Sequence, residues 1–415
     1  MKKSKGKGTI GLILSVALVP TIAFVAISNI PAVNQLSKQL TVASAGMTMW
    51  SAKSQNTNQA NAVNVNTENT NGVNAGGQEN SEVSTGSLWS LDMAPAEVET
   101  TGNPDQQAAP TPQTSQNVQT QQVTNNIIQL CSSPSNILNA KPYPVSMEAK
   151  SGAIKQMAYK PYTGAQIINL SAGGQVRNCT SISNDALIAE SKKQPEFKIE
   201  LNGQPQVLIM HTHTTESYEP TARDFYDASF NSRSTDNTKN VVAVGDAIAK
   251  ELQASGVAVI HDTTIHDYPQ YDFSYDRSRV TVQQILAKYP SIKVVLDVHR
   301  DAIQTADGVR TAPVTTIDGK QAAQIMIISG CDDGKMNMPN YMKNFRLSSA
   351  LQSQMETSYK GLTRPVLFDY RKYNQDLTTG SILLEMGSNG NSYDEAIYSG
   401  QLLGKSLSQV LLKLK

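Results

Sequence analysis

The stretch SYDRSRVTVQQILAKYPSIKVVLDVHR, residues 274–300, predicts a helix that leads directly into a buried strand. Pro290 stops the helix, because the residue before a proline avoids the helical backbone. Residues 292–298 form a short apolar run, which is typical of a strand buried on both faces. A helix followed at once by a buried strand is the repeating unit of an α/β fold.

The same alternation runs from Lys198 to the end of the chain. Further apolar runs predict strands at 206–210, 257–260, 323–329, 365–368 and 380–386. Amphipathic segments predict further helices at 237–256, 339–361 and 392–414. Strands that alternate with helices imply an α/β fold with a mostly parallel sheet flanked by helices on both faces. In such sheets, ligands bind at the carboxyl ends of the strands.

The first 30 residues predict a membrane anchor. Residues 1–7 hold four lysines, and residues 8–30 are uncharged and long enough to cross a bilayer as one helix. The basic tail is expected in the cytoplasm and the rest of the chain outside it, held to the cell membrane by a single span. A cleavable signal peptide is the alternative, because Ala43-Ser44-Ala45 is similar to a cleavage site.

Two segments separate this anchor from the α/β part. Residues 31–125 are rich in Asn, Gln, Thr and Ser and poor in large apolar side chains, so they predict a low-complexity linker. Residues 126–197 contain short alternating runs, and Gly173-Gly174 suits a hairpin turn between two of them. We expect a small β-containing module there, followed by the main domain over 198–415.

Charge and cysteine content exclude some classes of site and partner. The 35 Lys and Arg balance 35 Asp and Glu, and no basic block is interleaved with aromatic residues, so no nucleic-acid partner is expected. The three cysteines, Cys131, Cys179 and Cys331, are too scattered for a cysteine zinc site. A Cys131–Cys179 disulfide and three unpaired thiols both stay open.

Polar side chains suited to metal binding lie at the ends of three predicted strands. They are, in chain order, His211, His213 and Glu216, then His299 and Arg300, then Glu385. If these strands run parallel in one sheet, the groups meet at one edge. Two imidazoles and one carboxylate are the open ligand set of a catalytic zinc, which leaves a fourth position for water.

Some roles stay open from the residues alone. His211 and His213 are two apart, so on an extended chain they face the same way and both could be ligands. Glu385 lies among apolar residues, where an ionised carboxylate is costly unless it is paired or bound to something charged. A buried ion pair with Arg300 or Arg371 is the alternative to a catalytic role for Glu385.

Three motifs resemble those of a known family. HTHTTESY (211–218), DVHRDA (297–302) and LLEMGSNGNS (383–392) are similar, in this order and spacing, to motifs of the stage II sporulation protein P family. These proteins are membrane-anchored cell-wall hydrolases of endospore-forming bacteria, related to the zinc-dependent N-acetylmuramoyl-L-alanine amidases. The resemblance covers about residues 195–415 and the amino-terminal anchor.

The resemblance implies a ligand set and a catalytic residue. His211, Glu216 and His299 would bind zinc, and Glu385 would act as the acid-base residue. The opening motif departs from the broader amidases, because Glu216 follows His211 within five residues and a second histidine intervenes. His213 is therefore the alternative second ligand.

The resemblance also implies a substrate and partners. Zinc would activate a water molecule that cleaves the bond between the muramic-acid lactyl group and L-alanine in peptidoglycan. A second, endopeptidase activity on cross-links is implied as well. Arg300 and Asn389 would bind carboxylates of the substrate or support the site. The expected place of action is the septal wall during engulfment, with the membrane and the sporulation proteins D and M as partners.

Two other kinds of function compete with the amidase. One is a non-catalytic scaffold that tethers the wall through a degenerate metal site. The other is a metal-dependent deacetylase or carboxypeptidase that acts on peptidoglycan. An amidase frees intact stem peptides and a deacetylase frees acetate, so the products distinguish them.

Overall fold

The computed structural model describes residues 127–130 and 139–415, which all belong to one compact unit. The predicted basic tail (1–7), membrane anchor (8–30) and linker (31–125) lie outside these residues. Among the described residues, no helix is both long and apolar enough to cross a membrane. The anchor stays a prediction.

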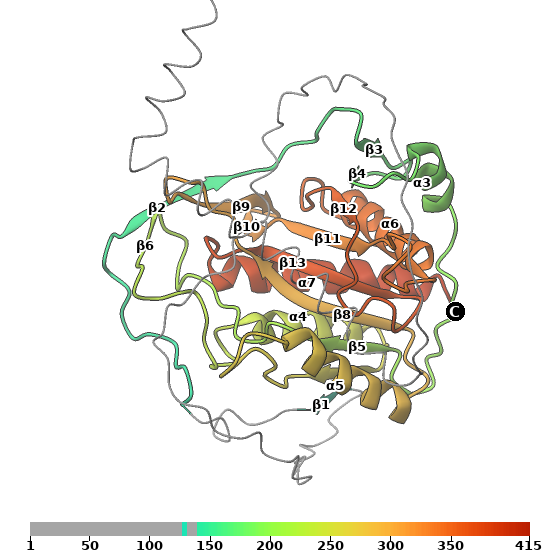
Figure 1. The fold of residues 1–415 in the computed structure, drawn as a ribbon, viewed down its shortest axis with the longest axis horizontal. Coiled ribbons are helices and arrows are strands. Elements are labelled where there is room, and N and C mark those ends of the chain that lie inside the picture. Colours follow the sequence, from blue (N-terminus) through green and yellow to red (C-terminus); the bar gives the residue numbers. More distant parts are fainter. Residues whose placement is uncertain (1–126, 131–138) are drawn as a thin grey trace, which may run out of the picture. The chain divides into compact units, whose positions relative to one another are not determined.

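A nine-stranded sheet forms the centre of the described chain (Figure 1). Its strands, in spatial order, are β1 (Ile127–Leu130), β7 (Val259–Asp262), β5 (Val207–Met210), β8 (Val294–Asp301), β13 (Ser381–Ser388), β11 (Ile325–Gly330), β12 (Val366–Asp369), β4 (Gln175–Asn178) and β3 (Ile167–Asn169). The strands that carry the candidate site, β8 and β13, are neighbours at its middle.

The sheet is mostly parallel, as predicted, with a reversal that the sequence does not predict. Six of its eight neighbouring pairs are parallel. Strand β11 runs antiparallel to β13, so β11, β12 and β4 point opposite to the first five strands. The hairpin predicted at Gly173-Gly174 is confirmed between β3 and β4, and both glycines have positive φ.

The predicted helices are confirmed, and they cover both faces of the sheet. They are α4 (Val241–Ala254), α5 (Ser274–Lys288), α6 (Tyr341–Ser358) and α7 (Tyr393–Leu412). The start of α4 is capped by Asn240, whose side chain accepts from the amide of Val242 at 2.9 Å. Ser392 and Glu395 form a capping box at the start of α7.

Alternate residues of β8 enter two different cores. Leu296 and Val298 pack in the large cluster that contains residues of α4, α6 and α7. Val295 packs in a second cluster, against Val282 of α5. Since successive side chains of a strand point to opposite faces, His299 has the parity of Val295 and lies on the α5 face.

The described chain also contains a second sheet of four strands, which the sequence analysis does not predict as a sheet. It consists of β10 (Lys320–Ala323), β9 (Arg310–Ile317), β2 (Gly152–Met157) and β6 (Phe225–Tyr226). Strands β9 and β10 form a hairpin around Asp318-Gly319, both with positive φ. An Asp-Gly pair is a strong hairpin signal, so this element was readable from the sequence.

Residues 126–197 do not form a module of their own, in contrast to the prediction. Their described strands join both sheets: β1 and the β3–β4 hairpin extend the two ends of the large sheet, and β2 pairs with β9. Helix α3 (Asn184–Ser191) packs on α6. These short strands pair with strands that are distant in the sequence. The alternation of apolar and polar residues within a strand does not indicate which strand it pairs with.

Two cysteines lie in the described part of the chain. Cys179 is half-buried and Cys331 is buried, and both are free thiols there. Burial raises the pKa of the Cys331 thiol to about 12, so it is expected to be unreactive in the folded protein. Cys131 lies outside the described residues, so its pairing stays open.

Candidate metal centre

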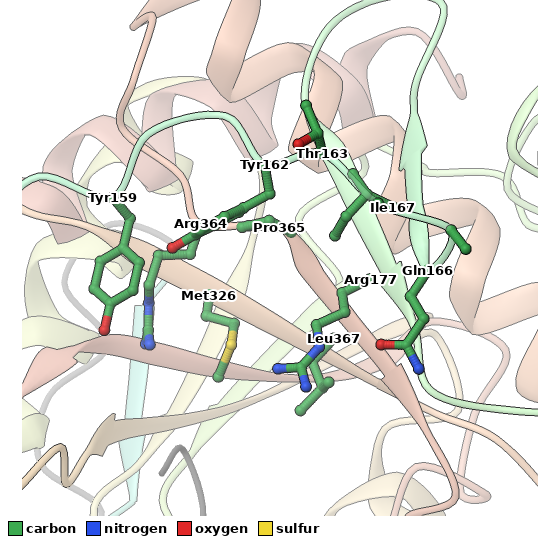
Figure 2. Close-up of a pocket in the computed structure, with 12 residues that line it drawn as sticks. Tyr159, Tyr162, Thr163, Gln166, Ile167, Arg177, Met326, Arg364, Pro365 and Leu367 are labelled. Carbon is green, nitrogen blue, oxygen red and sulfur yellow. The ribbon is translucent and has the colours of Figure 1, made fainter. Parts of the chain in front are cut away.

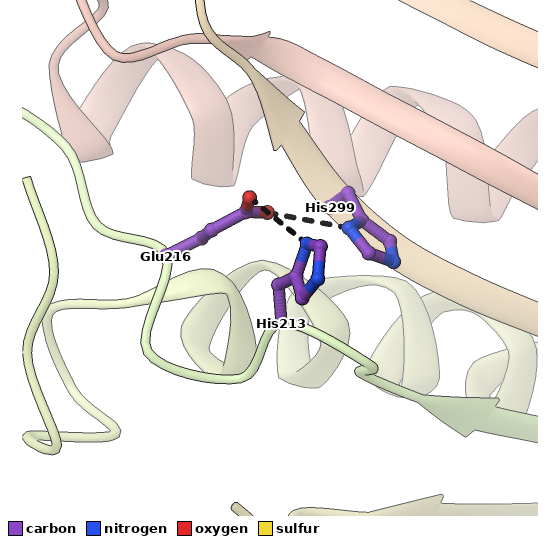
Figure 3. A group of neighbouring side chains, drawn as sticks. All are labelled: His213, Glu216 and His299. Carbon is purple, nitrogen blue, oxygen red and sulfur yellow. Dashed lines mark ion pairs between the residues drawn. The ribbon is translucent and has the colours of Figure 1, made fainter. Parts of the chain in front are cut away.

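Three side chains converge at the carboxyl ends of β5 and β8 (Figure 3). They are His213, Glu216 and His299, and one ligand-type atom of each lies within 4.8 Å of the others. His213 Nδ1 lies 3.5 Å from Glu216 Oε1, and His299 Nδ1 lies 3.4 Å from Glu216 Oε2. Glu216 and His299 are buried, while His213 is partly exposed. This is a two-histidine, one-carboxylate group, the kind of ligand set found in catalytic zinc sites.

A tight turn after β5 places two of these side chains. Strand β5 ends at Met210, and the amide and hydroxyl of Thr212 donate to the Asp297 carboxylate at 2.8 and 2.7 Å. The amide and hydroxyl of Thr215 donate to Asp267 at 3.0 and 2.6 Å. These two buried carboxylates hold the segment between Met210 and Glu216 out of the strand geometry.

His299 is placed by β8 and supported by its own strand. Asp297, two residues before it, lies on the same face, and its Oδ1 is 2.8 Å from His299 Nε2. Within the described residues, this buried nitrogen has no other polar partner, so the Asp297 carboxylate is the group that it meets. A carboxylate on the far nitrogen of a histidine is a common support in metal sites, because it orients the ring.

Glu216 is surrounded by positive groups. Its Oε2 accepts from the backbone amide of Arg300 at 3.0 Å, and its Oε1 lies 3.6 Å from Arg233 Nη2. Burial alone would raise the pKa of Glu216, but hydrogen bonds from the two histidines and the charge of Arg300 hold this pKa well below its usual value. Glu216 is therefore a carboxylate at neutral pH.

His211 lies outside this group, which corrects the predicted ligand set. In the pairing of β5 with β8, Met210 lies opposite Asp297 on the α5 face, so His211 points to the opposite face, under α4. Its Nδ1 donates to the Val298 carbonyl at 2.9 Å, and its Nε2 meets His261 Nε2 at 2.9 Å. Both ring nitrogens are thus engaged in the core.

The histidines of this core network act as hydrogen-bonding residues. His261 Nδ1 lies 3.0 Å from Asp246 of α4, and His266 Nδ1 donates to the His211 carbonyl at 2.8 Å. Burial, and next the proximity of His261, lower the pKa of His211 to about 3, so His211 is neutral at physiological pH. Neither His261 nor His266 joins the group around Glu216.

A glycine in α4 allows the two histidines to meet, and this gives a stability prediction. A Cβ on Gly245 would lie 2.6 Å from His261 Nε2 and 2.9 Å from His211 Nε2. In most helix interiors, glycine to alanine stabilises a protein by about 0.5–1 kcal/mol. Here Gly245→Ala is expected to destabilise it by about 1–3 kcal/mol in urea unfolding, because two buried rings must move. A gain in stability would contradict this packing.

Glu385 lies beside His299 in the sheet. In the parallel pairing of β13 with β8, Glu385 is opposite His299, so both side chains share one face. Glu385 is partly exposed, but its Oε2 is buried and has no hydrogen-bond partner among the described residues. Burial, and next the charge of Asp301, raise the pKa of Glu385 to about 8. A carboxyl group with such a pKa can hold and release a proton near neutral pH.

The alternative of a buried ion pair for Glu385 is not what the structure has. Within the described residues, Glu385 makes no ion pair with Arg300 or Arg371. Arg300 donates to the carbonyls of Ser217 and Ser232 at 3.1 and 2.8 Å. Arg371 pairs with the carboxylate of Asp369.

The match to a known protein family covers the residues of the candidate site. The family described as stage II sporulation protein P (SpoIIP) matches residues 34–408. The chain belongs to this family. The resemblance drawn from the three motifs is confirmed, and all three lie at the carboxyl ends of β5, β8 and β13.

A curated relative of the family agrees with this match. Stage II sporulation protein P of Bacillus subtilis (strain 168) is 32% identical over 200 residues, which make up 46% of this chain and 47% of the relative. The chain therefore matches about half the length of that relative.

The comparison with solved structures found amidases. The CwlD amidase from Clostridioides difficile, solved in complex with the GerS lipoprotein, is 10% identical, with a TM-score of 0.32 over 50% of this chain and 98% of that one. The amidase AmiC2 of Nostoc punctiforme is 11% identical, with a TM-score of 0.30 over 50% of this chain and 96% of that one. Similarity at this level does not establish an activity for this chain.

The two predicted substrate-binding residues of this family member have different surroundings. Arg300 is buried, and its side chain and backbone hold the loop that carries Glu216, so it supports the site. Asn389 follows β13, where its amide donates to the Asp301 carbonyl at 2.8 Å. Its side-chain Oδ1 is buried without a hydrogen-bond partner in the described chain. Substrate contact stays a prediction for Asn389.

Several residues near the group were not predicted. Tyr271 stacks on His213 with ring centroids 4.8 Å apart, and Tyr275 lies 5.5 Å from His213 and 6.3 Å from His299. Tyr373 stacks on Tyr275 at 5.1 Å. Tyr271 lies in the segment before α5, and Tyr275 lies in the first turn of that helix. Together the three tyrosines form an aromatic wall beside the histidines.

Proposed function

We propose that this chain is a zinc-dependent N-acetylmuramoyl-L-alanine amidase that hydrolyses peptidoglycan in the sporulating cell. The observation that carries the proposal is the group of His213, Glu216 and His299 beside Glu385, whose buried Oε2 has no hydrogen-bond partner within residues 127–130 and 139–415. Membership of the stage II sporulation protein P family supports the place of action.

The residues present fit a zinc ion. Imidazole and carboxylate are ligands that zinc accepts, and three protein ligands with an open fourth position are typical of catalytic sites. The Glu216 charge and the two imidazoles lie close enough for one ion. Asp297 behind His299 gives the support that such ligands usually have. We therefore assign His213, Glu216 and His299 as the ligands.

The proposed reaction is hydrolysis of the amide that joins the lactyl group to the stem peptide. When bound, the metal supplies Lewis-acid polarisation of the carbonyl and lowers the pKa of a water molecule. Glu385 takes one proton of that water at its buried oxygen and passes it to the leaving amine. The hydroxyl joins the carbonyl carbon, the C–N bond breaks, and the stem peptide leaves with a free amino group.

Metal removal tests this proposal. We expect the purified protein to bind about one zinc ion, and a chelator to abolish the release of stem peptides from sacculi. Added zinc should restore the activity, and mass analysis should find intact stem peptides. Release of acetate or of single amino acids would favour the deacetylase or the carboxypeptidase. Wall binding without any cleavage, with or without zinc, would favour the scaffold.

The finer expectations remain part of the same proposal. They are cleavage of cross-links as a second activity, the single membrane span over 8–30, and cooperation with the sporulation proteins D and M. The second activity and the two partners rest on what the motif resemblance implies, and the span rests on the uncharged run of residues 8–30. The location follows from the predicted span, which puts the described residues outside the cytoplasm.

A further inference from the structure

A pocket of about 240 Å³ lies over β11, β12 and β4, and none of the three tyrosines of the aromatic wall lines it (Figure 2). Arg364 at its edge donates to the Asp301 carboxylate at 2.8 Å, and Arg177 also interacts within the chain. The charges in this pocket are thus used in the fold, so the pocket offers no free charge to a ligand.

The two histidines of the metal centre are supported in different ways. His299 has the Asp297 carboxylate 2.8 Å from its Nε2. His213 turns its Nδ1 toward Glu216, at 3.5 Å, and its Nε2 has no hydrogen-bond partner among the described residues. A metal-binding histidine usually has a partner on its second nitrogen, which holds the ring in one orientation. A water molecule can accept from that nitrogen, but it cannot fix the plane of the ring.

Three aromatic rings contact His213. The Tyr271 ring stacks on it, with centroids 4.8 Å apart and an angle of 29° between the planes. The rings of Tyr275 and His299 meet it edge-on, at 72° and 76°, with centroids 5.5 and 4.9 Å away. Offset stacking and edge contacts are the arrangements that aromatic rings prefer. Together these contacts restrict both the tilt and the rotation of the His213 ring.

Tyr271 is itself held against the turn that carries His213. The Arg233 guanidinium lies 4.8 Å from the centre of the Tyr271 ring, a cation–π contact. Arg233 donates to Asp267 at 2.8 Å, and Asp267 also accepts from the amide and hydroxyl of Thr215. Thr215 belongs to the turn after β5. One buried carboxylate therefore links this turn to the cation that lies on Tyr271.

The stacking contact of Tyr271 is separable from the core. Tyr271 is 47% exposed and lies in the segment before α5. Its backbone carbonyl accepts from the amide of Ser274 at 3.2 Å, a bond that any residue at this position can make. Tyr275, in contrast, contacts both histidines and Tyr373, so its removal would disturb the whole wall. A change at Tyr271 removes the stacked ring and leaves the packing of the fold intact.

We propose that Tyr271 is a positioning residue for the metal ligand His213, and that its ring does for His213 what the Asp297 carboxylate does for His299. The inference rests on the proposed function, because the assignment of His213 as a zinc ligand comes from it. Without the stacked ring, His213 can rotate about its side-chain bonds, and metal binding has to stop that rotation. Zinc affinity should therefore fall while the fold persists.

Zinc affinity of the purified full chain, measured by competition with a chromogenic chelator, tests this inference. Tyr271→Ala is expected to weaken zinc binding about 10- to 100-fold, the range for loss of a residue that supports a ligand. Tyr271→Phe keeps the ring and should bind zinc as the original chain does. The thermal midpoint of the metal-free protein should be the same for all three chains, whereas loss of a merely structural residue would lower it.

Two further variants separate the ring from its surroundings. Tyr271→Leu keeps apolar bulk without a flat face and should weaken zinc binding as Tyr271→Ala does, so the test does not depend on one variant. Phe273 is 66% exposed and takes no part in the ring contacts of His213 among the described residues. Phe273→Asn is the matched control and should leave zinc affinity unchanged, because asparagine accepts the φ of 63° at this position.

Three results would overturn the inference. The first is equal zinc affinity in the original chain and in Tyr271→Ala and Tyr271→Leu. The second is an equal loss of affinity in Tyr271→Phe, since the hydroxyl and not the ring would then be the support. The third is a loss of zinc affinity in these variants that comes with a lower thermal midpoint of the metal-free protein.

The positioning role and the amidase can fail separately. If zinc-dependent release of stem peptides is found but Tyr271→Ala binds zinc like the original chain, the positioning role fails and the amidase stands. If Tyr271→Ala binds zinc more weakly but the original chain releases nothing from sacculi, the positioning role stands and the amidase fails.

Discussion

Glu385→Gln is expected to lower the release of stem peptides by about 10²- to 10⁴-fold, the range of a general acid-base group. Glutamine keeps the shape of the side chain but cannot accept a proton from water. Zinc binding should be unchanged, because Glu385 lies outside the three-residue group. Activity is measured on purified sacculi, and bound zinc is measured in the same preparation.

The pH dependence of folding stability is the control for Glu385→Gln. A carboxyl group with a pKa near 8 binds its proton more tightly in the folded chain than in the unfolded one, where its usual pKa is 4.5. Its contribution to stability is thus present at low pH and is lost as the pH rises from about 4.5 to 8. In the metal-free protein, Glu385→Gln should be as stable as the original chain at pH 4 and more stable at pH 8. Full activity in the variant would rule out Glu385 as the proton acceptor.

The order of helices and strands was predictable because it depends on local pattern. The apolar runs and the stops at Pro290 and Gly256 place α4, α5 and the strands that follow them. The direction of β11 was not predictable, because a short buried run has the same composition in either direction. The same limit applies to 126–197, whose strands pair with β7, β9 and β12.

The candidate site was predicted by residue type, but not in its geometry. Glu216, His299 and Glu385 lie together as the strand ends suggested. The pairing of Met210 with Asp297 directs His211 to the α4 face, and the turn held by Asp297 and Asp267 brings His213 back to the α5 face. The residue pattern of one strand does not predict its register with a neighbouring strand, so the sequence alone left the two histidines unresolved.

One signal for the support of the site was present in the sequence. Asp297 stands within VVLDVHR, an acid inside an apolar strand, where a carboxylate needs partners. The structure gives it three: the amide and hydroxyl of Thr212, and the ring of His299. Burial would raise the pKa of Asp297, but the charge of His299 and the hydrogen bonds at the carboxylate hold this pKa below its usual value. Asp297 thereby connects the turn after β5 with the strand that carries His299.

The two histidines of the opening motif give the second large prediction, since the structure separates their roles. His213→Ala is expected to abolish zinc binding and the release of stem peptides, with a loss greater than the 10- to 100-fold that changes in supporting residues cause. The fold should persist, because His213 is partly exposed and its ring lies against tyrosines at the surface of the site. Zinc content, circular dichroism and sacculus digestion are measured on one preparation.

His211→Ala is the matched variant, two residues away, and it should do the reverse. It removes a buried ring and leaves the Val298 carbonyl and His261 without their partner, so a loss of about 2–5 kcal/mol in unfolding free energy is expected. Molecules that stay folded should still bind zinc, because His213, Glu216 and His299 are intact. If His211→Ala instead loses zinc at unchanged stability, and His213→Ala keeps it, then the ligand is His211 and the pairing of β5 with β8 is shifted by one residue. A shift of one residue moves every side chain of the strand to the other face, so the two variants decide between the two registers.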